Sequence, residues 1–240
     1  MDINKYIDMC KSATMPEGIK VSGNTIIEAK LKYDSERVLA IPEGIEEIAD
    51  KAFFGTTGKL IIFPTSLKKI GRSAIGEFNH IIILSKGFSC SGSILATNVS
   101  TRYITAHSEG EYKTIFAPTD LSVPRRGRVK SSIKISKKEG LTVDLEKYMA
   151  VDKMGFSDKF MRAFYATRYF GADAHEDIRK CLKYGVDYAF KNSEIDIDDF
   201  KALNDMGDIT KTNITYLKKY ALTYDQDDIY DYLCSVKPKT

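Results

Sequence analysis

Apolar residues recur at a fixed spacing in the first half of the chain. Segment 40–53 aligns with segment 62–75 at an offset of 22 residues, with apolar residues matched to apolar residues and proline to proline. The matched pairs are Pro42 and Pro64, Ile45 and Leu67, Ile48 and Ile70, Ala52 and Ala74, and Phe53 and Ile75. Such a repeat is typical of a solenoid, in which stacked units bury ladders of equivalent apolar residues.

Short β-strands are expected within and around these units. Pro42 and Pro64 have no N–H for a strand ladder, which places each of them at the end of a strand. The expected strands are 25–31, 38–41, 60–63 and 80–84, followed by 94–95, 103–106 and 113–117, with segment 15–24 as a degenerate unit. Leu39, Ile61 and Ile83 are expected in register. The residues expected to be buried are Leu39, Ile41, Ile45, Ile48, Phe53, Leu60, Ile62, Leu67, Ile70 and Ile83.

From Thr142 onward the apolar spacing changes to the period of helices. The expected helices are 144–149, 158–170 and 174–191, one that starts at Ser193 or Asp196 and ends near Gly207, and two that start at Thr210 and Asp225. Asp144 and Ser157 are expected as N-caps, Asp173 with Glu176 as a capping box, and Gly171 as a C-terminal stop. Short helices with short loops predict an α-solenoid or a small bundle.

The two periodicities predict an α+β protein in three parts. A β-solenoid with an N-terminal cap covers residues 1–117, and a basic linker or strand segment covers 118–141. An all-α domain of helical hairpins covers 142–240.

The repeat resembles the BspA-type leucine-rich repeats of bacterial proteins, whose units read roughly Ile-Pro-x-x-Val-x-x-Ile-Gly-x-x-Ala-Phe. The matching residues are Ile41-Pro42, Ile45, Ile48 and Ala52-Phe53, then Phe63-Pro64, Leu67, Ile70-Gly71 and Ala74. The chain departs from the pattern at Ala49, where a Gly is usual, and at Ile75, where a Phe is usual. The resemblance implies a repeat scaffold that binds other proteins.

The second half is similar to the helical, ankyrin-like domain that follows such repeats in some bacterial proteins. Residues 143–148, 161–168 and 228–233 carry this resemblance, and 200–214 has the helix-turn-helix shape of an ankyrin-like unit. The Thr-Pro-Leu-His signature of ordinary ankyrin repeats is missing. This resemblance implies a second binding scaffold.

Charge, hydropathy and cysteine content indicate the compartment in which the protein is expected. Lys and Arg number 36 and Asp and Glu 33, a balance that favours no class of partner. Residues 1–11 carry charges inside what would be the apolar region of a secretory signal, and no stretch approaches a membrane span. Cys10, Cys90, Cys181 and Cys234 lie far apart, as inert thiols in a reducing compartment do. We therefore expect a cytoplasmic protein without membrane contact.

No catalytic or metal-binding pattern is found in the sequence. His80, His107 and His175 are scattered, without the spacing of a zinc site, and phosphate-loop and nucleophile-elbow motifs are absent. The acidic clusters 194–199 and 225–231 lack the glycine and glutamate of a calcium loop and are interpreted as helix N-termini. We expect no enzymatic activity, no cofactor and no metal.

One basic run is the candidate partner-binding site. It consists of Arg125, Arg126, Arg128, Lys130, Lys134, Lys137 and Lys138, with no acidic residue among them. Such charge suits an acidic protein or the phosphates of a nucleic acid, although the run lacks aromatic residues that would stack on bases. A solvated strand over 131–136 with its lysines outward explains the run equally well.

These observations favour a non-catalytic scaffold for protein–protein interaction. The alternative is a nucleic-acid-binding protein that uses the basic segment 125–138. The protein partner, the oligomeric state and the pathway stay open.

Overall fold

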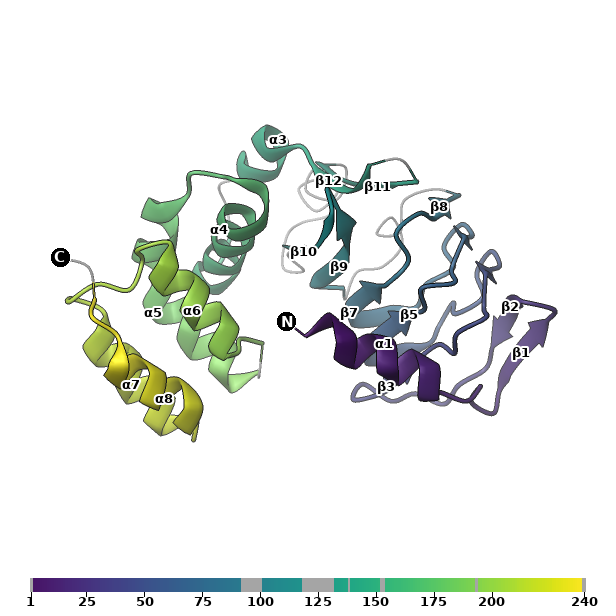
Figure 1. The fold of residues 1–240 in the computed structure, drawn as a ribbon, viewed down its shortest axis with the longest axis horizontal. Helices are drawn as coiled ribbons and strands as arrows, with labels where there is room; N and C mark the ends of the chain where they lie inside the picture. The colour runs from purple at the N-terminus through teal and green to yellow at the C-terminus, as the bar shows by residue number, and fades with distance from the viewer. Residues whose placement is uncertain are drawn as a thin grey trace. The chain divides into compact units, whose positions relative to one another are not determined.

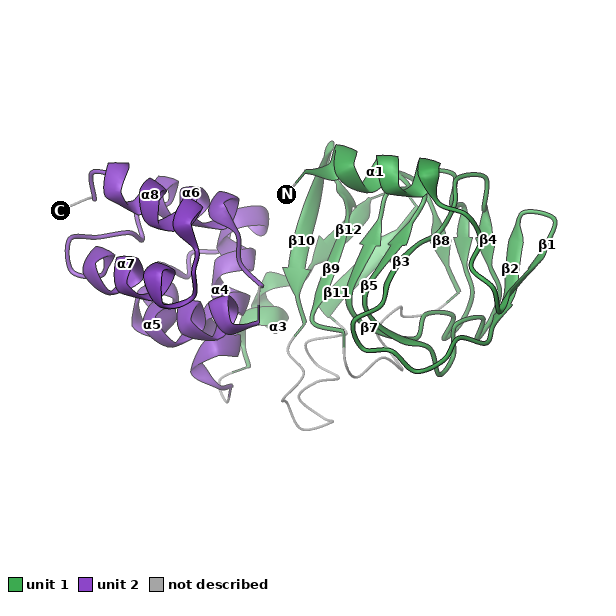
Figure 2. Cartoon of the chain, turned by 90° about the horizontal axis from the view of Figure 1, so that it is seen from below, with its two compact units in different colours: residues 1–151 green, residues 152–240 purple. Residues whose placement is uncertain are grey.

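The computed structural model describes residues 2–91, 101–117, 132–137, 139–151, 154–192 and 194–238 (Figure 1). The chain divides into two compact units, Met1–Val151 and Asp152–Thr240 (Figure 2). The first is a β-solenoid of about three turns and the second is built of helices, so the expected α+β class is confirmed.

Two sheets form the walls of the solenoid. The first contains β1 (Ile19–Ser22), β2 (Thr25–Ala29), β4 (Glu47–Ile48), β6 (Lys69–Ile70) and β8 (Ser89–Cys90) in that order. The second runs from β3 (Val38–Ala40) through β5 (Thr57–Phe63), β7 (Glu77–Ile83), β9 (Tyr103–Ser108) and β12 (Gly140–Val143) to β11 (Ile133–Ser136), and β10 (Glu111–Phe116) also pairs with β9. One strand of each sheet makes a rung, and β2 with β3 is the first rung.

Parallel pairing between rungs produces the expected apolar ladders. Val38 pairs with Leu60 and Glu47 with Lys69, which confirms the offset of 22 residues between the first rungs. All ten residues expected in the core are buried except Leu60, which is partly exposed. The repeat pattern therefore identified buried positions, although Ile62 is buried on the outer face of its sheet rather than inside the solenoid.

The register expected for the third strand is wrong. Ile61 pairs with Ile81, and Ile83 pairs with Phe63, so this rung follows after 20 residues. The shortening lies in the turn before β7, at Gly76. A Cβ atom there would lie 2.2 Å from the carbonyl oxygen of Thr56, so only glycine permits the tighter turn.

Antiparallel hairpins replace the repeat after β9. Strands β9 and β10 form one hairpin and β11 and β12 another, which joins the same sheet through Gly140 and Ser108. The short helix α3 (Leu145–Met149) follows, and the Tyr148 hydroxyl donates to the Phe116 carbonyl at 2.5 Å. Strands 103–106 and 113–117 are thus confirmed, whereas 94–95 lies outside the described residues. The first unit continues to Val151, although the sequence pattern places the helical domain from 142.

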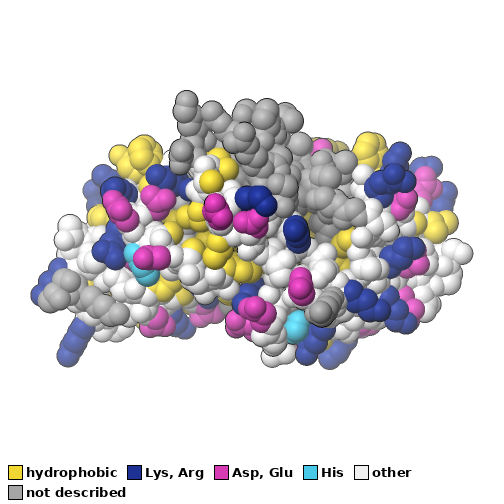
Figure 3. Space-filling model, turned by 90° about the horizontal axis from the view of Figure 1, so that it is seen from above, with side chains coloured by type: hydrophobic (Ala, Val, Ile, Leu, Met, Phe, Trp, Pro, Cys, Tyr) yellow, Lys and Arg dark blue, Asp and Glu magenta, His cyan; other side chains and the backbone are white. Residues whose placement is uncertain are grey.

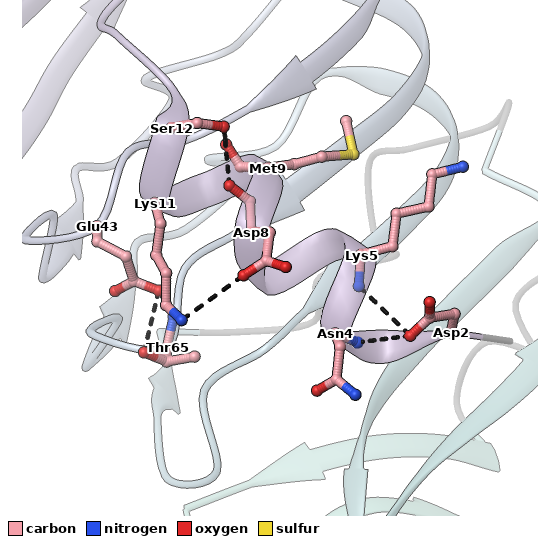
Figure 4. Close-up of polar contacts among 9 residues, drawn as sticks. All are labelled: Asp2, Asn4, Lys5, Asp8, Met9, Lys11, Ser12, Glu43 and Thr65. Atoms are coloured by element: carbon pink, nitrogen blue, oxygen red, sulfur yellow. Dashed lines mark hydrogen bonds and ion pairs between the residues drawn. The ribbon is translucent and has the colours of Figure 1, made fainter.

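A helix that the sequence analysis did not predict covers the outer face of the second sheet. Helix α1 (Ile3–Ser12) is capped by Asp2, which accepts from the Asn4 amide at 3.0 Å (Figure 4). Its buried Cys10 packs on Ile62, with Leu60 partly buried beside them. Apolar side chains at helical spacing mark this face: Ile3, Tyr6, Ile7 and Cys10. That spacing was a detectable signal.

The second unit contains five helices among its described residues. They are α4 (Phe156–Phe170), α5 (His175–Lys191), α6 (Ile197–Asp205), α7 (Ile214–Thr223) and α8 (Asp227–Ser235). Helices α4 and α5 approach closely at Gly185, where a Cβ atom would lie 2.2 Å from the Phe160 ring. No described helix is long and apolar enough to cross a bilayer.

Three of the expected helix ends are confirmed. Asp144 caps α3, Asp196 forms a capping box with Asp199 at α6, and Gly171 ends α4 in the left-handed conformation. These residues have the side chain, or the freedom of φ, that the position requires.

Other expected caps are wrong. Helix α4 begins one residue before Ser157, with Gly155 as its cap, and α5 has Ala174 rather than Asp173 at that position. Helices α7 and α8 begin after Asn213 and Gln226, not at Thr210 and Asp225. A capping residue in the sequence thus indicates that a helix start is near without giving its exact position.

Candidate functional site

Exposed apolar side chains gather in the first rungs of the solenoid. Among the described residues eight large hydrophobic side chains are exposed, and five of them precede residue 55. These five, here called the N-terminal surface, are Val21, Ile27, Tyr33, Val38 and Phe54. Single exposed hydrophobic residues are ordinary on protein surfaces, so it is their concentration in the first rungs that makes this part of the fold a candidate binding region.

Two neighbouring loops position the aromatic members of this surface. The Arg37 guanidinium donates to the Thr57 carbonyl at 2.9 Å, and the Asp34 amide donates to the Thr57 hydroxyl at 3.2 Å. These bonds hold the loop of Tyr33 against the loop that follows Phe54. Tyr33 is 82% exposed and Phe54 is 70% exposed, so neither ring contributes to the core.

The hairpin of β1 and β2 carries Val21 and Ile27. Strand β1 lies at the edge of its sheet, pairing only with β2 among the described strands. Glu28 bridges Lys20 at 2.7 Å and Lys30 at 3.0 Å, and hydrogen bonds from both lysines lower the pKa of its carboxyl group. The charged side chains beside Val21 and Ile27 therefore form ion pairs with one another.

Strand β3, which carries Val38, ends the second sheet. The Arg37 carbonyl accepts from the amides of Lys59 and Leu60, and the Ile41 amide donates to the Ile62 carbonyl. Alternate residues of a strand direct their backbone groups to opposite sides, so Val38 and Ala40 direct theirs away from β5. No described residue bonds to these groups. The N-terminal surface thus includes an open strand edge.

Charged side chains along the rungs form pairs between neighbouring turns. Lys68 lies 2.7 Å from Glu46, and Arg72 lies 3.8 Å from Asp50. At the turn below α1, Glu43 accepts from the Thr65 amide and hydroxyl, both at 3.0 Å (Figure 4). Basic and acidic side chains are also interspersed on the face drawn in Figure 3. These pairs neutralise part of the charge on the described surface of the rungs.

The basic run predicted as a binding site lies largely outside the described residues. Arg125, Arg126, Arg128, Lys130 and Lys138 fall there. Lys134 is exposed on strand β11 and Lys137 is exposed just after it, as the solvated-strand interpretation expects for those two. The nucleic-acid hypothesis stays a prediction.

Burial favours the neutral forms of three titratable side chains in the solenoid, Cys10, Cys90 and His80. Burial raises the pKa of the Cys10 and Cys90 thiols to about 12, with the Glu43 charge adding to the effect at Cys10. Burial lowers the pKa of His80 to about 4, and its Nε2 atom lies 2.8 Å from the Thr105 hydroxyl. A thiolate nucleophile and a charged imidazole are therefore both disfavoured at neutral pH.

The helical unit presents a smaller aromatic feature. The exposed rings of Phe156 and Tyr184 stack with centroids 5.0 Å apart, one from α4 and one from α5. The nearest approach to a catalytic arrangement is His175, whose Nδ1 atom lies 2.9 Å from the fully buried Asp208. The Arg179 Nε atom donates to the same carboxylate at 3.0 Å, so Asp208 joins α5 to the turn after α6. Within the described ranges, no group of His, Cys, Asp or Glu could hold a metal ion.

Comparison with family models, with curated proteins and with solved structures finds no match for this chain. The surface itself therefore carries the functional argument. Sequence reasoning did not identify Tyr33, Val38 or Phe54 as functional. Phe54 directly follows the repeat's inward Phe53, and a second aromatic residue at that point was the one available signal.

Proposed function

We propose that this chain is a non-catalytic scaffold for protein–protein interaction. The observation that carries the proposal is the concentration of exposed apolar side chains in the first rungs, beside an open strand edge. Aromatic side chains such as Tyr33 and Phe54 contribute most to protein interfaces when a partner removes them from water.

The finer identity of the scaffold belongs to the same proposal. The first unit is a BspA-type leucine-rich-repeat solenoid, and the second is an ankyrin-like array of helical hairpins. The proline-led repeat with its Ala-Phe ending supports the first assignment. The pairing of α4 with α5 and of α7 with α8 supports the second. Repeat folds of both kinds present extended binding surfaces.

The test is affinity capture from a native lysate with the full chain and two variants, followed by mass spectrometry. The variant Y33S/F54S removes the aromatic rings, and L222S changes an exposed residue of the helical unit as the matched control. We expect proteins enriched by the parent and by L222S to be depleted at least tenfold with Y33S/F54S. Purified candidates are then titrated against all three chains. Equal enrichment by the parent and Y33S/F54S would refute the assignment of this surface.

A further inference from the structure

The helical unit contains one histidine, and a buried carboxylate fixes its ring. The Nδ1 atom of His175 lies 2.9 Å from the carboxylate of Asp208, whose side chain is fully buried, while the His175 side chain is 32% exposed. An ionised carboxylate only accepts hydrogen bonds, so Nδ1 carries the proton and donates it. The lone pair of the neutral ring is then on Nε2, which forms no hydrogen bond with any described residue. His175 is therefore oriented as a nucleophile.

The turn that carries Asp208 is itself held in place. The side-chain amide of the buried Asn213 donates to the Asp208 carbonyl at 2.6 Å and accepts from the Thr210 amide at 2.8 Å. The carboxylate therefore has a fixed position beside the ring. A bond formed at Nε2 places positive charge on the imidazole, and a buried carboxylate that accepts from Nδ1 stabilises this charge.

A guanidinium group beside the ring favours an anionic group at Nε2. Arg179 follows His175 by one turn of α5, and its Nε atom donates to the other oxygen of the Asp208 carboxylate at 3.0 Å. The Arg179 side chain is 54% exposed, and its two terminal nitrogens bond to no described residue. A guanidinium binds phosphate oxygens through two parallel hydrogen bonds. The chemistry beside His175 therefore suits a phosphoryl group better than a neutral acyl group.

The acidic side chains of the first turn of α5 are neutralised. Glu176 is ion-paired with Lys180, and Asp177 lies 3.2 Å from Lys159. Their charges therefore oppose an added phosphate only weakly, and the positive end of the helix dipole favours it.

We propose that His175 is a phosphorylation site, at which Nε2 accepts a phosphoryl group and Arg179 binds its oxygens. The donor is a small phosphoramidate or acyl phosphate. The lone pair of Nε2 forms the N–P bond as the bond between phosphorus and the leaving group breaks, and that electron pair departs with the leaving group. Asp208 holds the proton on Nδ1 throughout. This site lies in the helical unit and goes beyond the proposed scaffold function.

The experiment uses the full chain and potassium phosphoramidate, which transfers its phosphoryl group to histidine and releases ammonia. Peptide mapping measures the rate at each histidine, and phosphorus NMR identifies the nitrogen that is modified. His107, which is partly exposed on β9, is the comparison within the same chain. R179Q removes the guanidinium, and K183Q removes an exposed cation one turn further along α5 as the matched control. D208N removes the carboxylate charge, and thermal unfolding checks that all three variants fold.

We expect His175 to react at least tenfold faster than His107, on Nε2. R179Q should slow the reaction at least fivefold, K183Q should react like the parent, and D208N should lose the preference for Nε2. Equal rates at His175 and His107, reaction of the parent on Nδ1, or equal effects of R179Q and K183Q would overturn the proposal. If D208N does not fold, the nitrogen modified in the parent decides.

Discussion

The solenoid and the helical unit place their charges differently. Along the rungs the ion pairs lie at the surface, as between Lys68 and Glu46, while the interior holds ladders of isoleucine, leucine and phenylalanine. In the helical unit, carboxylates of Asp199 and Asp208 are buried and ion-paired. In a repeat, the same apolar contacts recur between each pair of neighbouring turns, and these contacts align the turns. Helices of unequal length lack that repetition, so we infer that directed polar contacts set their alignment.

The buried contacts join helices that are distant in sequence. Arg168 of α4 pairs with Asp199 at the start of α6, and its guanidinium also lies 4.9 Å from the centre of the Tyr169 ring. Asp208 joins α5 to the turn after α6, and its carbonyl accepts from the Asn213 side chain at 2.6 Å. Loss of one such carboxylate should therefore cost more than loss of any rung charge.

The largest effect is expected for I48D. Ile48 is fully buried between β2 and β6, and an unpaired charge there should destabilise the first unit by about 5 kcal/mol or more. Hydrogen exchange measured segment by segment should show lost protection from β2 to β8 and retained protection from α4 to α8. The control E47D keeps a carboxylate at the neighbouring outward position. If I48D unfolded at the same temperature as the parent, Ile48 would not belong to a buried apolar ladder.

The next effect concerns Asp208. D208A removes the shared acceptor of His175 and Arg179 and should cost about 3 kcal/mol, because buried ion pairs are strongly destabilised by loss of one partner. Urea unfolding measures the loss of stability, and hydrogen exchange should show that the loss of protection lies in the helical unit. D228A, at an exposed position of α8, is the control and should change stability by about 0.5 kcal/mol at most. Equal effects of the two substitutions would contradict the comparison.

A pH-dependent effect is expected in the solenoid. Burial lowers the pKa of His80 from 6.5 to about 4, so the unfolded chain binds more protons between these values. The free energy of unfolding should fall as pH drops from 6.5 to 4, by up to about 3 kcal/mol, reduced by the partial exposure of the ring. Denaturant unfolding of the parent and H80Q across this range measures the difference. A parent and a variant with the same pH dependence would show that His80 is solvated.

The sequence predicted the solenoid interior because equivalent positions recur there. Leu39 and Ile61 could be aligned by counting, but Ile83 could not, since the two-residue shortening at Gly76 depends on a backbone approach that counting does not detect. Helix α1 was missed because it lies outside the repeat. The candidate surface was missed for a different reason: a period shows which residues point inward, but not which end of a stack lacks a neighbour.

The smallest expected effect is the coupling between two rung charges, and it tests the comparison most directly. Lys68 and Glu46 are both exposed and lie 2.7 Å apart, so a double-mutant cycle of K68Q and E46Q should give a coupling of about 0.5 kcal/mol that weakens in 1 M salt. The same cycle on Arg168 and Asp199 is the buried counterpart and should give a coupling several times larger. If the rung pair couples as strongly as the buried pair, its charges set the register of the solenoid. The apolar ladders alone would then not account for its alignment.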